Sequence, residues 1–411
     1  VDNCTFEENT ASSGGAIVLE NDNTGAKASI KAEITNETQF TKNEVTNYGG
    51  AIYFENKGFY EDNALTIANS YFTENKVKGS GGGGAIYTKT SLELSNVEFK
   101  GNTSDALGGA IYINNSESNV FNATFDNTKF IDNTTTSSGG AMAISLTKAT
   151  EGMIVLQNGT TFERNQSAAK SFGYDGGGAI HAMAKMGVKV SLSDVTMHDN
   201  SAKGDGGAIS ADIKNLEATD TKIYNNTAGK AGGGIYLKAS QVNAQAVFTR
   251  LETRGNTAQA NGGGISLSGT LATGKAVFDS CTITDNTTAK NGGGIHSQLP
   301  EITVHDTLVS GNTANCFYGG GIYLSSYTGG GVFTVSGSTA FYGNKAPKDP
   351  KTATFKISGN TPSADIFVRN SSGTSSTKSE STLNGFDELL TKEVESGNIT
   401  YKLTHTDPVK Q

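Results

Sequence analysis

The 411-residue chain has no tryptophan, only 5 prolines and 3 cysteines, and only 35% apolar residues. Three cysteines cannot form the disulfide framework of a small secreted scaffold. No apolar run approaches the roughly 18 residues that a membrane-spanning helix needs, so we expect no membrane-spanning segment in this chain. The net charge of −8 disfavours nucleic acid as a partner.

Glycine is abundant, with 52 residues, and much of it lies in one recurring tetrapeptide: two glycines, a small residue and an apolar residue. The tetrapeptide occurs eleven times at intervals of 25 to 38 residues, starting at Gly14, Gly49, Gly83, Gly108, Gly139, Gly177, Gly206, Gly232, Gly262, Gly292 and Gly319. A period of this size indicates a solenoid, in which each repeat buries its apolar face against the next. We expect the glycines at tight corners that need positive φ or close contact between coils.

A second motif, an apolar residue followed three positions later by asparagine, precedes the glycine pairs. Its asparagines are Asn9, Asn43, Asn75, Asn102, Asn133, Asn165, Asn200, Asn226, Asn256, Asn286, Asn312 and Asn344. We predict that these side chains point inward and form a structural ladder, because stacked asparagine amides bond to one another and to backbone groups of adjacent turns.

The apolar residues before the second motif predict strands rather than helices. In the repeat with Leu92, Leu94, Val97 and Phe99 the steps are two, three and two. A step of two is strand alternation, and the step of three indicates a bend or bulge. A third strand follows each glycine pair, as at 111–113. The predicted fold is all-β, a single-stranded parallel β-helix of about twelve coils, right-handed by analogy.

Residues 1–346 are predicted to form one continuous β-helix, and residues 347–411 a last imperfect coil with a C-terminal cap or linker. Within the cap, 384–390 is compatible with a short helix and 399–403 with a strand. The sequence begins inside a coil, so we expect a fragment of a larger, exported precursor.

The combination of Phe99…Asn102 with Gly108-Gly109-Ala110-Ile111, repeated along the chain, resembles the chlamydial polymorphic outer-membrane-protein (Pmp) family and similar adhesin-like β-helix proteins. This resemblance implies an autotransporter passenger at the cell surface, outside the cell, that acts as a non-catalytic adhesin. It also implies a partner of host-cell or microbial origin, either a surface protein or a glycan.

The residue after the apolar position of the glycine motif alternates outward and is often tyrosine. We identify these tyrosines as candidate ligand-binding residues, because tyrosine is favoured at interfaces and stacks on sugars: Tyr53, Tyr87, Tyr112, Tyr236 and Tyr323. The alternative is that tyrosine suits exposed strands and packs on its neighbours along the stack.

Longer inserts break the period in three places and carry further aromatic candidates for ligand binding. These residues are Phe59, Tyr60, Phe172, Tyr174, Phe317 and Tyr318. Loops that interrupt a solenoid often carry binding sites.

Two other functions remain open. An uncapped coil is a sheet edge, so the chain could be a structural subunit that assembles end to end into a filament or coat. Polysaccharide lyases and hydrolases also use β-helices, and His198 with Asp199 offers a base and a carboxylate. Other repeats place unrelated residues at these two positions, so we expect no catalytic residue. The sequence has no His/Cys spacing of a metal site and no phosphate-binding glycine loop, so we also expect no metal and no cofactor.

Overall fold

The computed structural model describes most of residues 1–346 and several strands beyond them. Within 1–346 it leaves out 22–28, 57–63, 117–119, 169–175, 185–186, 270–272, 317, 327–331 and 337, and beyond 346 it describes 366–370, 380–383, 388–395 and 398–405. Two compact units are present. The N-terminal unit contains Val1–Asn215 and Asn226–Gly229, and the C-terminal unit contains Leu216–Asn225 and Lys230–Gln411.

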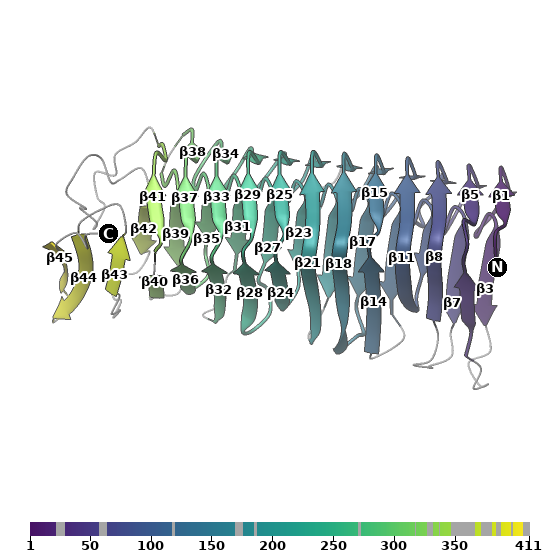
Figure 1. Cartoon of the computed structure of the whole chain (residues 1–411), viewed down its shortest axis with the longest axis horizontal. Coiled ribbons are helices and arrows are strands. Elements are labelled where there is room, and N and C mark those ends of the chain that lie inside the picture. The colour runs from purple at the N-terminus through teal and green to yellow at the C-terminus, as the bar shows by residue number, and fades with distance from the viewer. Residues whose placement is uncertain are drawn as a thin grey trace. The chain divides into compact units, whose positions relative to one another are not determined.

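The N-terminal unit is built from three parallel sheets whose strands come from successive coils (Figure 1). The phenylalanine sheet contains β1 (Thr5–Glu7), β4 (Lys31–Ile34), β5 (Gln39–Thr41), β8 (Ala64–Thr73), β11 (Ser91–Lys100), β14 (Val120–Asp126), β15 (Lys129–Ile131), β18 (Glu151–Glu163) and β21 (Val188–His198). The short sheet contains β2 (Thr10–Ala11), β6 (Glu44–Val45), β9 (Lys76–Val77), β12 (Thr103–Ser104), β16 (Thr134–Thr135), β19 (Gln166–Ser167), β22 (Ser201–Ala202) and β26 (Thr227–Ala228). The isoleucine sheet contains β3 (Ile17–Asn21), β7 (Ile52–Asn56), β10 (Ile86–Thr88), β13 (Ile111–Asn115), β17 (Met142–Leu146), β20 (Ile180–Ala184) and β23 (Ile209–Asp212).

The C-terminal unit repeats the same three kinds of strand. Those of the phenylalanine type are β24 (Asn215–Thr219), β25 (Lys222–Tyr224), β28 (Ala244–Thr249), β29 (Glu252–Arg254), β32 (Gly274–Asp279), β33 (Thr282–Thr284), β36 (Glu301–His305), β37 (Leu308–Ser310), β40 (Val332–Ser336) and β41 (Ala340–Tyr342). The short strands are β30 (Thr257–Ala258), β34 (Thr287–Thr288) and β38 (Thr313–Ala314). The isoleucine type comprises β27 (Ile235–Lys238), β31 (Ile265–Ser268), β35 (Ile295–Ser297), β39 (Ile322–Ser326) and β42 (Ile366–Asn370). A separate antiparallel sheet holds β43 (Glu380–Leu383), β44 (Glu388–Glu395) and β45 (Asn398–His405).

The register aligns equivalent residues of neighbouring coils, so each coil contributes one side chain to each stack. Phe72 pairs with Phe40 on one side and with Phe99 on the other. The phenylalanine rings of the N-terminal unit stack nearly parallel from Phe6 to Phe162, with centroids between 4.6 and 5.0 Å apart. Apart from the first ring they are fully buried, and burial of such large apolar side chains is the main favourable term holding the coils together.

The bend predicted between Leu94 and Val97 is present. Asn96 lies there in the left-handed region, at φ 53, within β11. Leu94, Val97 and Phe99 are all buried, because the left-handed residue restores the inward alternation after the step of three.

The glycine pairs serve two different steric needs. Gly108 adopts φ 67, where a side chain would be strained and would overlap the Ile111 carbonyl oxygen. Gly109 has an ordinary backbone conformation, but a Cβ there would overlap the Gly140 carbonyl oxygen of the next coil. The first glycine therefore permits the corner, and the second permits the close stacking of one coil on the next.

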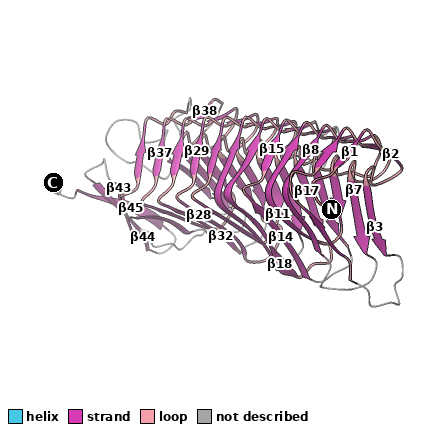
Figure 2. Cartoon of the chain, turned by 45° about the vertical axis from the view of Figure 1, so that its right-hand side comes forward, coloured by secondary structure: helices cyan, strands magenta, loops and turns pink. Residues whose placement is uncertain are grey.

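The predicted fold class is confirmed: the described residues form an all-β parallel solenoid, with about 10 turns where about twelve were expected. Figure 2 shows strands and loops but no helix among these residues, and none of them could form a helical membrane span. The short helix considered for 384–390 is wrong for Glu388–Leu390: these residues form the start of strand β44 and pair with β45. Residues 384–387 lie outside the described residues. The handedness and the domain boundary at 346 stay predictions.

Candidate functional site

The asparagines after the phenylalanine positions form an inner ladder within each unit, from Asn9 to Asn226 in the N-terminal unit and from Asn256 to Asn344 in the C-terminal unit. Asn9, in the first coil, is exposed, although an inward side chain was predicted there. In the N-terminal unit Asn102 donates from Nδ2 to Oδ1 of Asn133 at 3.0 Å and to the Phe72 carbonyl at 2.9 Å. Its backbone N–H donates to the same Oδ1 at 3.0 Å. Every hydrogen-bonding atom of the amide is used, and the side chain is fully buried. The C-terminal unit has the same pattern from Asn256 through Asn286 and Asn312 to Asn344.

The tyrosine line departs from expectation, because the side chains predicted to be outward and exposed are buried. In the N-terminal unit Tyr53, Tyr87 and Tyr112 form a closed cluster, with Tyr48 and Leu107 packed against it. The rings of Tyr53 and Tyr87 stack with centroids 5.4 Å apart. Strand alternation directs these side chains to the face opposite the inward isoleucines, but Tyr48 and Leu107, in the turns before two of the glycine pairs, pack against them. A buried ring cannot offer its face to a ligand, and the observed stacking is the alternative that the sequence left open.

Burial also changes the chemistry of this cluster. It raises the pKa of Tyr53 far above its usual value, and the carboxylate of Glu55, which accepts the Tyr53 hydroxyl hydrogen bond, raises it further. The pKa of Tyr87 is raised mainly by burial as well. Glu55 is itself buried and paired with Lys89. These phenols therefore stay protonated and act as packing groups.

The remaining aromatic candidates are dispersed. In the C-terminal unit Tyr323 is buried and stacks on His296 at 5.4 Å, and Tyr236 is half-buried. Tyr318 is half-buried, and its backbone N–H donates to Oδ1 of Asn291 at 3.1 Å. The candidates Phe59, Tyr60, Phe172, Tyr174 and Phe317 lie outside the described residues.

The acid–base groups considered for polysaccharide cleavage do not form a recognisable catalytic pair. Nδ1 of His198 lies 2.8 Å from a carboxylate oxygen of its sequence neighbour Asp199, which is exposed. In the C-terminal unit the register places His305 beside Asp279. Together with Asp306 they form a cluster in which the atoms that could bind a metal ion lie within 4.8 Å of one another. Glycoside chemistry needs two carboxyl groups facing across a sugar, and the predicted pair of His198 and Asp199 supplies only one.

A second line of asparagines, which was not predicted from the sequence, follows the bend of the phenylalanine sheet in the N-terminal unit. This bend line consists of Asn3, Asn36, Asn69, Asn96, Asn127 and Asn158, all exposed and all at φ between 43 and 53. Asparagine suits the left-handed conformation because its short polar side chain bonds locally. Nδ2 of Asn127 donates to Oδ1 of Asn96 at 2.7 Å, and Nδ2 of Asn96 to Oδ1 of Asn69 at 3.2 Å.

The bend line has a sequence signal: an asparagine three residues before the inner phenylalanine, as in Asn69…Phe72 and Asn96…Phe99. In the coil of Asn36 the spacing to Phe40 is four, because one extra residue, Glu37, is inserted. Glu37 also adopts φ 60, so two successive non-glycine residues are left-handed here. The extra residue interrupts the line of bonded amides, since Asn36 donates to Oδ1 of Asp2 at 2.5 Å.

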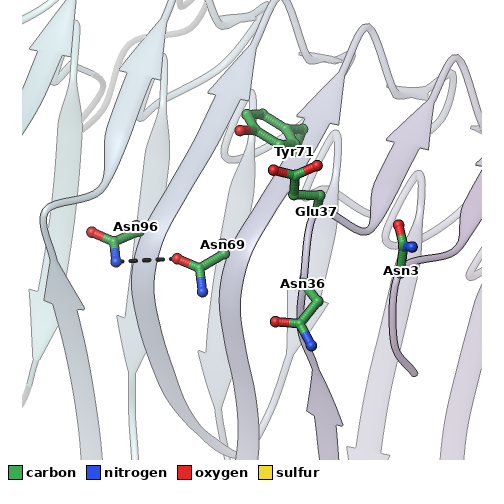
Figure 3. Close-up of a pocket in the computed structure, with 6 residues that line it drawn as sticks. All are labelled: Asn3, Asn36, Glu37, Asn69, Tyr71 and Asn96. Atoms are coloured by element: carbon green, nitrogen blue, oxygen red, sulfur yellow. Dashed lines mark hydrogen bonds between the residues drawn. The ribbon is translucent and has the colours of Figure 1, made fainter.

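A polar surface pocket of about 470 Å³ opens at this interruption, lined by Asn3, Asn36, Glu37, Asn69, Tyr71 and Asn96. In Figure 3 the four asparagines follow one another across neighbouring strands, with Tyr71 and Glu37 together on one side of them. Tyr71 on β8 is 43% exposed. In the described part of the chain, the Asn69 Nδ2 group, the Glu37 carboxylate and the Tyr71 hydroxyl have no hydrogen-bond partner. The pocket therefore presents unused donors and acceptors beside an exposed ring.

Comparison with known proteins agrees with the repeat pattern. A family described as the Chlamydia polymorphic membrane protein (Chlamydia_PMP) repeat matches residues 3–20, 37–55, 69–89, 96–114, 194–212, 220–238 and 280–298. Several of these segments begin at the bend position itself, including those at Asn3, Asn69 and Asn96. The predicted resemblance to the Pmp family is confirmed.

Two curated relatives extend this resemblance. The "Probable autotransporter YfaL" of Escherichia coli (strain K12) is 31% identical over 248 residues, which cover 56% of this chain and 18% of that protein. The "Probable outer membrane protein pmp7" of Chlamydia pneumoniae is 25% identical over 245 residues, which cover 56% of this chain and 24% of that protein. The chain thus spans about a fifth to a quarter of the length of these relatives. No solved structure matches it.

Proposed function

Because the chain is a Pmp-like repeat protein, we propose that it is a surface-exposed autotransporter passenger that acts as a non-catalytic adhesin. The observation that carries this proposal is the match of its repeats to the Pmp repeat, together with relatives named as an autotransporter and an outer membrane protein. We place it at the cell surface, on the outside. Its partner would be a protein or glycan on a host cell or a neighbouring cell.

The fold supports adhesion more than catalysis. Its repeating register presents long rows of aligned side chains on fixed strands, which suits recognition of an extended partner. One such row, the bend line, borders the pocket lined by Glu37 and Tyr71. Hydrogen-bonding groups of this lining are free to bind a partner. The inserted loops remain part of the proposal, since loops that break a solenoid's period often carry binding.

The proposal is tested by binding of the purified, fluorescently labelled chain to cultured epithelial cells and to bacterial cells. Saturable binding that unlabelled chain competes away is expected. The same chain after thermal unfolding is the control for nonspecific adsorption. Absence of saturable binding to every cell type tested would contradict the adhesin proposal, and concentration-dependent self-assembly in light scattering would favour the structural-subunit alternative.

A further inference from the structure

The interrupted part of the bend line holds the one pair of consecutive left-handed non-glycine residues among the described residues of the N-terminal unit. Asn36 and Glu37 are consecutive non-glycine residues at φ 52 and 60. A left-handed conformation costs a residue such as glutamate roughly 1 kcal/mol or more. The coil of Asn158 also carries one extra residue at the equivalent place, and there it is Gly159, at φ 81. Glutamate thus stands where glycine would be less strained.

The strain places a carboxylate at the edge of the pocket. Glu37 lies beside the exposed ring of Tyr71, and the amides of Asn69 and Asn96 continue the lining across the next strands (Figure 3). Strands stacked at about 4.8 Å bring one amide per coil to this surface. A ligand lying along the line therefore meets a regular series of hydrogen-bonding groups and one aromatic face.

We infer that this pocket binds an uncharged oligosaccharide, a ligand class that deepens the proposed adhesin function and rests on it. Amides and carboxylates hydrogen-bond to sugar hydroxyls, since each hydroxyl both donates and accepts. The exposed face of Tyr71 packs against the apolar face of a sugar ring. The Glu37 carboxylate accepts hydrogen bonds from neighbouring hydroxyls, and charge-assisted bonds of this kind are the stronger ones.

The lining argues against other classes of ligand. A peptide added as a strand needs a free sheet edge, whereas the strands beside Glu37, Tyr71 and Asn96, which are β5, β8 and β11, are paired on both sides. Among the described residues β1, which follows Asn3, pairs with β5 alone. A protein interface of ordinary strength centres on packed apolar anchors, and this lining is amide and carboxylate with one tyrosine. Glycans bearing carboxylate or sulfate groups would meet the Glu37 carboxylate on a chain of net charge −8.

The experiment is saturation-transfer-difference NMR of the whole chain with single oligosaccharides: maltotetraose, cellotetraose, chitotetraose and lacto-N-tetraose, with sialyllactose and tetragalacturonate as acidic probes. Signals from at least one neutral probe, and none from the acidic probes, are expected. Absence of signal from every neutral probe would overturn the inference. Cell binding that persists in that case would leave the adhesin proposal standing, so the two failures are distinguishable.

Variants assign the signal to the pocket. Tyr71→Ala and Glu37→Gly should each weaken binding of the neutral probe at least tenfold. Glu37→Gly should at the same time raise the unfolding midpoint, because glycine relieves the left-handed strain. A merely structural role for Glu37 predicts the opposite, unchanged or improved binding. Tyr342→Ala, at an exposed tyrosine of the C-terminal unit, is the matched control and should bind normally; equal loss in this control would contradict the assignment.

Discussion

The inner ladder and the bend line of the N-terminal unit use the same residue, stacked at the same interval, with opposite consequences. Asn133 on the inner ladder is fully buried, and all its amide atoms are bonded within the chain. Asn127, six residues earlier in the same coil, is exposed at φ 43 and bonds to one neighbour. A buried amide must be satisfied by the protein, whereas an exposed one is satisfied equally well by water or by a ligand. Burial therefore decides which asparagine line holds the fold and which is available for binding.

The largest difference in stability between the two asparagine lines should appear when a glycine beside each line is replaced by alanine. In Gly109→Ala the new Cβ would overlap the Gly140 carbonyl oxygen and crowd Thr134 beside the inner ladder, so we expect a loss of at least about 4 kcal/mol or failure to fold. In Gly159→Ala on the bend line the new Cβ meets only Oδ1 of Asn127, at 3.7 Å. Its cost should be about 1 kcal/mol, from the left-handed conformation alone.

Urea unfolding followed by circular dichroism measures both glycine variants. Equal unfolding midpoints for the two would contradict the steric account of the stacked coils.

Replacing an asparagine of each line by alanine should give the next largest difference in stability. Asn133→Ala removes the acceptor of two Asn102 donors and the donor to the Phe99 carbonyl, all buried. Leaving such groups unsatisfied should cost roughly 3 kcal/mol or more. Asn127→Ala should change the free energy of unfolding by less than about 0.5 kcal/mol, as expected for an exposed side chain. Chemical unfolding of both variants under one condition checks this, and a cost at Asn127 as large as that at Asn133 would be inconsistent with it.

The buried His181 gives a third comparison, because burial of a titratable group makes stability depend on pH. His181 is buried, its Nδ1 has no partner among the described residues, and burial lowers its pKa to about 4, although Asp212 raises it slightly. At this residue the unfolded chain therefore binds more protons than the folded chain between about pH 6.5 and 4. The contribution of His181 to stability is constant above that window and falls as the pH decreases through it, by up to about 3 kcal/mol.

The change His181→Tyr, which places the residue found at the equivalent position of other coils, should reduce this pH dependence. Thermal unfolding from pH 4 to 8 measures it. An identical pH profile in the variant would show that His181 is not responsible.

The smallest effect on stability is expected for the ion pair of Asp132 and Arg164, which flank the inner ladder; Arg164 is exposed and Asp132 is half-buried. Nε of Arg164 lies 2.8 Å from Oδ1 of Asp132, and this guanidinium lowers the pKa of the aspartate. Because water screens both groups, Arg164→Ala should cost no more than about 1 kcal/mol, and less at high salt. Unfolding at two salt concentrations tests this. If Arg164→Ala lowered the free energy of unfolding as much as Asn133→Ala does, solvent exposure would not determine how much these interactions contribute to stability.

The sequence allowed the fold and its interior to be predicted, because these depend on periods that the residues themselves display. The glycine pairs, the bend between Leu94 and Val97 and the inward Phe99 all lie where spacing placed them. The burial of Tyr53, Tyr87 and Tyr112 could not be predicted, because alternation gives the direction of a side chain but not what packs over it. Here the turns containing Tyr48 and Leu107 cover the ring line.

The pocket was missed for a different reason. Its asparagines do recur three residues before the inner phenylalanine, so the bend line was available as a pattern. Its interruption depends on one extra residue, Glu37, whose φ of 60 only coordinates reveal. In the sequence this insertion shows only as a spacing of four instead of three between Asn36 and Phe40, and such a spacing does not by itself indicate a pocket.

Amide hydrogen exchange at Asn102 measures whether the buried asparagine ladder holds neighbouring coils together, because the backbone N–H of Asn102 donates only to the side-chain Oδ1 of Asn133. We expect slow exchange in the unmodified chain and much faster exchange at this amide in Asn133→Ala, with little change in Asn127→Ala. Fast exchange at Asn102 in the unmodified chain, or a rate unaffected by Asn133→Ala, would contradict this role of the ladder.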